Sequence, residues 1–186
     1  MDWLAAPDYW LARLIFQRLL AAIYLIGFLV ALDQFRPLLG ERGLLPAPDF
    51  IRQVPFRRSP SLFYVRYSDR VLVGVATLGG ALAFGALLGA PDLVPLPIAM
   101  LWWALLWALY LSIVNVGQTF YAFGWESLLC ETGFLAIFLG AAGTAPSFAV
   151  IVLMRWLVFR VEFGAGLIKM RGDRCWRDLT CLYYHH

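Results

Sequence analysis

Lysine is almost absent from this sequence, and basic residues of either kind are missing from its middle. Lys169 is the only lysine of the 186-residue chain, and no lysine or arginine lies between Arg70 and Arg155. That interval is long enough for three membrane crossings of about 20 residues each. The net charge is only +3, and its carriers flank apolar runs. This excludes the clustered basic face of nucleic-acid-binding proteins. The charged residues of the interval are Asp92, Glu126 and Glu131.

The common enzyme motifs are also missing. There is no G-x-S-x-G, P-loop, dinucleotide glycine motif or H-E-x-x-H, so nothing specifies a hydrolase, a nucleotide enzyme or a cofactor. Of three cysteines, Cys130 lies in an apolar run and is expected to pack there. Cys175 and Cys181 would form a disulfide in an oxidising compartment and stay thiols in a reducing one. With His185 and His186 they fit no standard zinc spacing, so we expect no metal site.

Apolar residues are abundant instead. They make up 62% of the chain, and the mean hydropathy is +0.74, whereas soluble domains run about 45–50% apolar. No basic segment precedes the first apolar run, which indicates a retained span rather than a signal peptide. We therefore predict an all-α polytopic membrane helix bundle of about five transmembrane helices, forming a single domain over residues 1–182. The predicted spans are residues 11–32, 71–88, 97–116, 122–142 and 148–168.

The first two spans are separated by residues 33–70, a long loop rich in proline and arginine. Each proline biases its predecessor away from helix. Two interpretations stay open, a solvated connector and a re-entrant or interfacial piece, because residues such as Phe50 and Phe56 are too apolar for a free loop. In the first span, Arg13 and Arg18 can snorkel to the headgroup layer, and Asp33 is expected to end the helix.

Charged residues inside the last spans are the main candidates for function. A charge deep in hydrocarbon costs about 2.5–3.5 kcal/mol on insertion scales. Arg155 and Glu162 share one helix face two turns apart, while Arg160 lies about 140° around the helix from Arg155. We expect Glu126 and Glu131 to supply anions for the two arginines, in an unspecified pairing. The cluster either locks the bundle or lines a polar cavity with a chemical role.

Three blocks of the sequence resemble the lipase maturation factor family. They are GERGLLPAPDF at 40–50, NVGQTFYAFGWESLLCETGFLAIFLG at 115–140 and RWLVFRVEFGAGLIKMRGDRCWRDLTCL at 155–182. The last block contains the family's Gly-Asp-x-Cys-Trp-Arg-Asp-Leu-Thr-Cys signature. Its main positions here are Gly172, Asp173, Cys175, Trp176, Arg177, Asp178 and Cys181.

The resemblance implies a non-catalytic factor that helps secreted dimeric lipases fold and assemble. Its expected partners are the lipid bilayer and a lipase client, or another membrane or secreted protein, docking around residues 173–181. The family's membrane part is distantly similar to that of vitamin K-dependent carboxylases, so the alternative is a membrane enzyme acting on a lipid-soluble substrate. The family normally continues into a soluble C-terminal domain, absent after the 169–186 tail, and usually has Asp where this chain has Tyr183. A truncated remnant without activity is therefore a third interpretation.

The membrane in which the protein is expected depends on whether the organism is a eukaryote or a bacterium. The resemblance implies the endoplasmic reticulum membrane in a eukaryote, or the cytoplasmic (inner) membrane in a bacterium. The positive-inside rule places residues 33–70 and the tail in the cytoplasm, whereas the family places its C-terminal domain in the lumen. The sequence leaves this conflict open.

Overall fold

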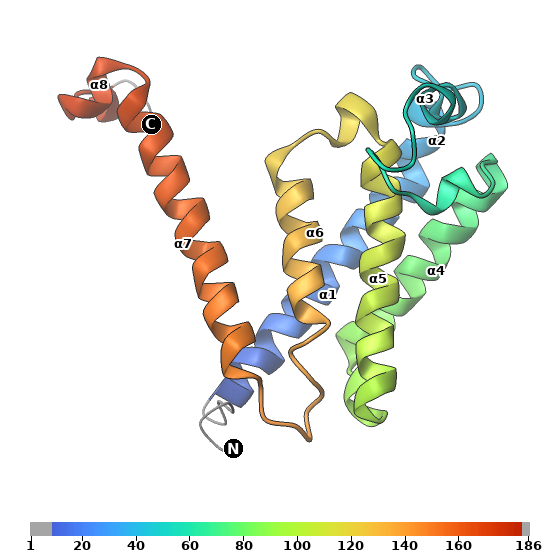
Figure 1. Cartoon of the computed structure of the whole chain (residues 1–186), viewed down its shortest axis with the longest axis horizontal. Helices are drawn as coiled ribbons and strands as arrows, with labels where there is room; N and C mark the ends of the chain where they lie inside the picture. The colour runs from blue at the N-terminus through green and yellow to red at the C-terminus, as the bar shows by residue number, and fades with distance from the viewer. Residues whose placement is uncertain (1–8, 184–186) are drawn as a thin grey trace.

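The computed structural model describes residues 9–183, apart from the side chain at position 182. Every regular element in this part of the chain is a helix, which confirms the all-α prediction. Three helical stretches are long and apolar enough to cross a membrane, Trp10–Leu39, Asp69–Leu88 and Leu96–Val116. They pack side by side, and a fourth long helix leans away from them (Figure 1).

The first span is longer than predicted. Helix α1 (Trp10–Val30) continues through a π-helical turn, η3 (Ala31–Phe35), into α2 (Arg36–Leu39). Asp33 therefore does not end the helix. Pro37 lacks an N–H and its ring crowds the carbonyl four residues earlier, so a regular α-helix is disfavoured there. The wider π-helical turn precedes the proline and lets the helix continue.

The next two helices begin and end close to the limits predicted for the second and third spans. Helix α4 (Asp69–Leu88) begins after Ser68, whose hydroxyl accepts a 3.2 Å hydrogen bond from the Val71 amide. It ends at Gly89, which adopts the left-handed conformation (φ 99°) that favours glycine. A 3-10 turn, η5 (Ala90–Leu93), leads into α5 (Leu96–Val116).

The last two predicted spans differ from each other. Helix α6 (Gly124–Ala136) has 13 residues, which extend about 20 Å and fall short of a hydrocarbon core of about 30 Å. The predicted end near residue 142 was wrong, because Gly140 (φ 82°) lies in an irregular connector. Helix α7 (Phe148–Arg171) has 24 residues and is long enough, but three charged residues lie within it. Its crossing of the membrane remains a prediction.

Residues 33–70 are folded against the bundle. They contain α2, α3 (Ala47–Gln53) and a 3-10 turn, η4 (Leu62–Tyr64). Ser59 donates a 2.6 Å hydrogen bond to the Asn115 carbonyl near the end of α5, and Ser61 donates a 2.8 Å bond to the Ser112 carbonyl. This segment is thus a cap on α5, and a freely solvated connector is ruled out.

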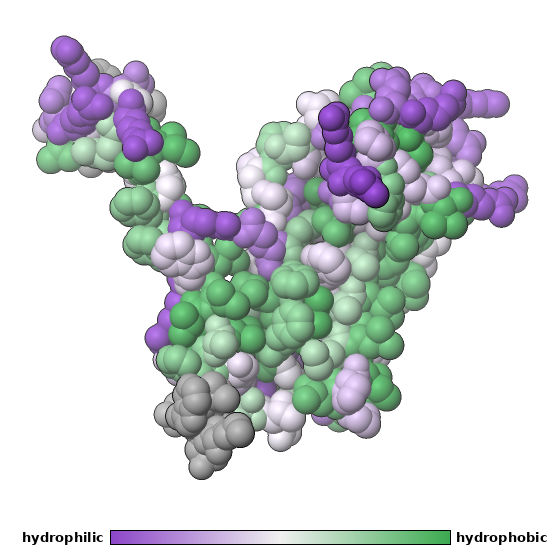
Figure 2. Space-filling view, viewed as in Figure 1, coloured by the Kyte–Doolittle hydropathy of each residue, from purple (hydrophilic) through white to green (hydrophobic). Residues whose placement is uncertain are grey.

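The core lies between α1, α4 and α5. Its largest fully buried side chains include Tyr24, Phe28 and Leu106. Large apolar side chains such as Ile23 and Leu101 are more than half exposed, and the middle of the bundle is mostly hydrophobic in Figure 2. Hydrophilic residues gather instead over α3 and α8, at the same end of the molecule (Figures 1 and 2). The exposed hydrophobic side chains thus form a band around the middle of the bundle, and such a band indicates a lipid-facing surface.

Candidate functional site

Arg160 on α7 forms an ion pair with Glu131 on α6. The two side chains are 51% and 46% exposed, so the pair lies at the side of the bundle rather than in its core. It is one of the pairings that the sequence allowed. Because the carboxylate compensates the guanidinium, the pair reduces the cost of placing both charges in an apolar layer.

The other expected pairing does not occur. Glu126 accepts a hydrogen bond from the Tyr110 hydroxyl of α5. Arg155 donates a hydrogen bond to the Tyr9 hydroxyl, and its guanidinium carbon lies 5.1 Å from the centre of the Tyr9 ring. Glu162 lines the same cavity as Arg155. The five charged residues predicted as one cluster are therefore distributed over three separate places.

The family signature forms a compact knob at the end of α7. We define this signature knob as residues 172–181, which include α8 (Arg174–Arg177). Cys175 and Cys181 are joined by a disulfide, and Cys181 is 1% exposed. The backbone also closes the loop, because the Thr180 amide donates a 2.8 Å hydrogen bond to the Cys175 carbonyl.

Two further contacts attach the signature knob to α7. The Arg177 Nε atom donates a 2.7 Å hydrogen bond to the Met170 carbonyl. The Lys169 Nζ atom lies 4.9 Å from the centre of the Trp176 ring, within cation–π range. Lys169 and Arg177 also suit the C-terminal end of a helix, where basic residues meet the negative end of the dipole. The signature knob is therefore held as one unit with the end of α7.

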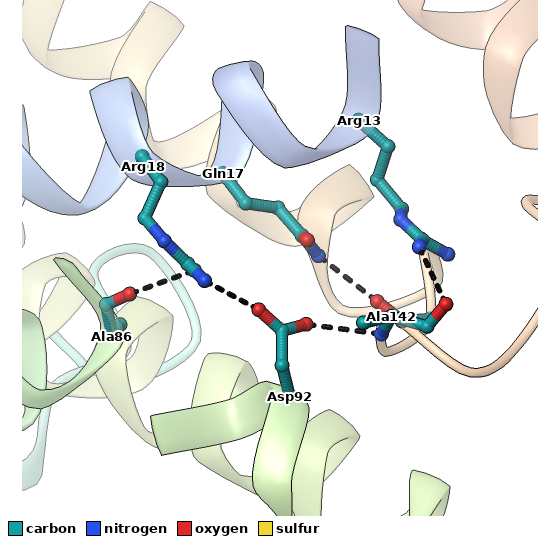
Figure 3. A network of polar contacts seen from close by, with 7 residues as sticks. Arg13, Gln17, Arg18, Ala86, Asp92 and Ala142 are labelled. Atoms are coloured by element: carbon teal, nitrogen blue, oxygen red, sulfur yellow. Dashed lines mark hydrogen bonds and ion pairs between the residues drawn. The ribbon is translucent and has the colours of Figure 1, made fainter. Parts of the chain in front are cut away.

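A polar network at the opposite end of the bundle was not expected from the sequence. Arg18 on α1 forms a 2.5 Å ion pair with Asp92 of η5 and donates a 3.0 Å hydrogen bond to the Ala86 carbonyl. The other Asp92 oxygen accepts a 3.0 Å hydrogen bond from the Ala142 amide (Figure 3). Asp92 thus connects α1 with the segment between α6 and α7.

Arg13 and Gln17 extend this network. Arg13 donates hydrogen bonds to the carbonyls of Ala142, at 3.1 Å, and Thr144, and Gln17 donates one to the Gly140 carbonyl at 3.0 Å. Arg13 is 4% exposed, so the expectation that it snorkels to the headgroups was wrong. The connector after α6 has no regular backbone ladder, and its free carbonyls accept hydrogen bonds from these side chains instead. The spacing of Arg13 and Gln17, which places them on one helix face, was a sequence signal for this network.

The described residues contain no cluster of metal ligands. No group of three or more His, Cys, Asp and Glu residues among positions 9–183 could hold a metal ion. His185 and His186 lie outside the described residues.

The long apolar helices, the exposed hydrophobic band and the disulfide-closed loop at one end together define a polytopic helical membrane protein. The chain matches the family described as "Lipase maturation factor transmembrane domain" over residues 11–186. It belongs to the lipase maturation factor family.

Curated relatives agree with this assignment. The chain is 41% identical to Lipase maturation factor 1 of Bos taurus and 42% identical to that of Homo sapiens, with 98% and 96% of this chain covered. It is 35% identical to Lipase maturation factor 2 of Xenopus laevis over 96% of this chain. The alignments cover 36%, 34% and 28% of those proteins, so the chain spans about a third of their length. No solved structure matches the chain.

Proposed function

We propose that this chain is the membrane part of a lipase maturation factor, and that it presents the signature knob to a lipase client. The observation that carries the proposal is the family match over residues 11–186, which ends in a disulfide-closed knob on a projecting helix (Figure 1). Its membrane would be the endoplasmic reticulum in a eukaryote and the cytoplasmic membrane in a bacterium.

The exposure of the signature knob supports a docking role. Leu179 is 74% exposed and has a positive φ of 58°, a conformation that ordinary side chains rarely adopt. The disulfide and the hydrogen bond from the Thr180 amide to the Cys175 carbonyl fix the loop that carries it. A preorganised loop loses less conformational entropy on binding than a free chain end does.

The test is co-purification with a secreted dimeric lipase expressed in the same cells. Replacing both cysteines of the signature knob (Cys175→Ser with Cys181→Ser) opens the loop. We expect the lipase to co-purify with the wild-type chain. With the double variant, the amount of co-purified lipase should fall by at least about tenfold, at an equal amount of protein in the membrane. Cys130→Ala, which removes the buried cysteine of α6, is the matched control and should retain the lipase. Equal recovery with the double variant, or no recovery with the wild type, would refute the proposal.

One cavity supports the alternative of a membrane enzyme. Glu131 and Arg160 line a space of about 390 Å³ together with Cys130, which is large enough for a small lipid-soluble molecule. The two charges pair with each other, and a reacting group would have to compete with that pair. Glu131→Gln should then abolish turnover without loss of folded protein. If the charges only hold α7 against α6, the same change should lower the thermal stability instead.

A further inference from the structure

A second cavity lies between α7 and the helices α1 and α6. Its volume is about 510 Å³, within the range of small-molecule sites. The helices α1, α6 and α7 all contribute to it, with mainly apolar side chains such as Phe16, Leu128 and Val158. We name this space the α7 groove. Because α7 diverges from the bundle (Figure 1), lipid can reach it from the side.

One end of the α7 groove carries a cation. Arg155 lines it and contacts Tyr9, which directly precedes Trp10 at the start of α1. Aromatic residues at the ends of spans mark the headgroup layer. Arg155 lies seven residues after Phe148, about 10 Å along the helix, and its long side chain can snorkel toward that layer. Among residues 9–183, no carboxylate lies within ion-pair distance of Arg155.

We propose that the α7 groove is a binding site for an anionic phospholipid of the bilayer. One acyl chain lies along the apolar lining, and the phosphate lies beside the Arg155 guanidinium. Arginine suits this role, because its planar fork can donate two parallel hydrogen bonds to a phosphate. The site goes beyond client docking, since it lies at the other end of α7 from the signature knob.

A second charge in the α7 groove fixes the orientation of the lipid. Glu162 lines it about two turns beyond Arg155, and its carboxylate repels a phosphate there. The headgroup is therefore favoured at the Arg155 end only. Arg160 is already paired with Glu131 and lines a different cavity. It thus provides a matched control, an arginine of the same helix whose charge is compensated.

The experiment uses the full chain reconstituted into vesicles of phosphatidylcholine with a minor share of phosphatidylglycerol. Electron paramagnetic resonance measures how strongly spin-labelled phosphatidylglycerol associates with the protein relative to spin-labelled phosphatidylcholine. We expect the wild type to prefer phosphatidylglycerol. Arg155→Gln should lower the preference about fivefold, the size expected for one basic residue near an anionic surface. Arg160→Gln should leave it within a factor of two.

Further measurements separate the other occupants. Glu162→Gln should not lower the preference, because a carboxylate does not hold the phosphate. An equal loss with Glu162→Gln would overturn the proposal, because the preference would then depend on a carboxylate that should repel the phosphate. Oligomers without lipid preference would indicate that a second copy fills the α7 groove and would also overturn it.

Two results address the cation itself. An unchanged preference in Arg155→Gln, or an equal loss in Arg160→Gln, would show that no specific site exists. Should Arg155→Gln fail to fold, high salt applied to the wild type provides the same test, because it screens an exposed cation. Persistence of the full preference at 1 M salt would then refute the proposal.

Discussion

Removing the Asp92 carboxylate tests the network that joins α1 to the segment between α6 and α7. Asp92→Ala eliminates the partner of Arg18 and the acceptor of the Ala142 amide. It leaves the Arg18 guanidinium without its ion-pair partner. Asp92→Asn keeps an acceptor oxygen but removes the charge. The two variants therefore separate the electrostatic part from the hydrogen-bonding part.

The size of the effect follows from burial. Removing one partner of a fully buried ion pair costs about 3–5 kcal/mol. The Arg18 and Asp92 side chains are 27% and 13% exposed, so water compensates part of that loss. We expect the free energy of unfolding to fall by about 3 kcal/mol for Asp92→Ala and about 2 kcal/mol for Asp92→Asn. Asp49→Asn is the control, because the Asp49–Arg52 pair is 54% and 76% exposed and such pairs on one helix contribute about 0.2–0.5 kcal/mol.

Circular dichroism of the protein in mild detergent measures the thermal transition. For a chain of this size, 1 kcal/mol corresponds to roughly 2–4 °C in Tm, so the Asp92 variants should melt about 4–12 °C below the wild type. Asp49→Asn should change Tm by no more than about 2 °C. A double-mutant cycle with Arg18→Met should give a coupling energy above about 0.5 kcal/mol. Equal shifts for Asp92→Ala and Asp49→Asn, or purely additive effects in the cycle, would refute the reasoning.

Two other predictions concern packing and pH. A Cβ atom at Gly133 would lie 1.7 Å from the hydroxyl of the fully buried Tyr24, so Gly133→Ala should lower stability by about 1–3 kcal/mol. Gly164 has no neighbour within 4 Å of such an atom, so Gly164→Ala should raise stability by about 0.5–1 kcal/mol. Equal melting temperatures for the two variants would contradict the prediction. Burial raises the pKa of Tyr67 above its ordinary value of 10, and the nearby Asp69 and Glu41 carboxylates add to this. A raised pKa means that its contribution is full below about pH 10 and is lost at higher pH, so Tm should fall less steeply above pH 10 in Tyr67→Phe than in the wild type, and parallel profiles would contradict this.

The central helices were predictable because residues close to their ends determine their limits. Residues 71–88 and 97–116 were expected, and the helices are Asp69–Leu88 and Leu96–Val116. Uncharged apolar runs bounded by Gly89 and by prolines leave few positions at which a helix could begin or end. The end of α6 was not predictable in the same way. The connector after it is apolar enough to extend the span, and its departure from helix accompanies contacts with Arg13 and Gln17 far away in the sequence.

The candidate site was predictable only in part. Opposite charges in neighbouring spans suggested the pair between Arg160 and Glu131. The sequence did not reveal that Glu126 would meet a tyrosine, because a hydroxyl donor carries no charge pattern. Nor did it reveal the pairing of Arg18 with Asp92, which are 74 positions apart. Contacts between the ends of different helices depend on how those helices are placed in space, and periodicity along one helix does not contain that information.

The signature knob and the arginine-rich cap formed by residues 33–70 stand at the same end of the bundle (Figure 1). Whichever compartment oxidises Cys175 and Cys181 therefore also receives the arginines of the cap. Attachment of an impermeant thiol reagent to this pair, only after reduction, would report the sidedness of both segments in one measurement. The side of the membrane on which the disulfide lies therefore determines the orientation of every helix in the bilayer.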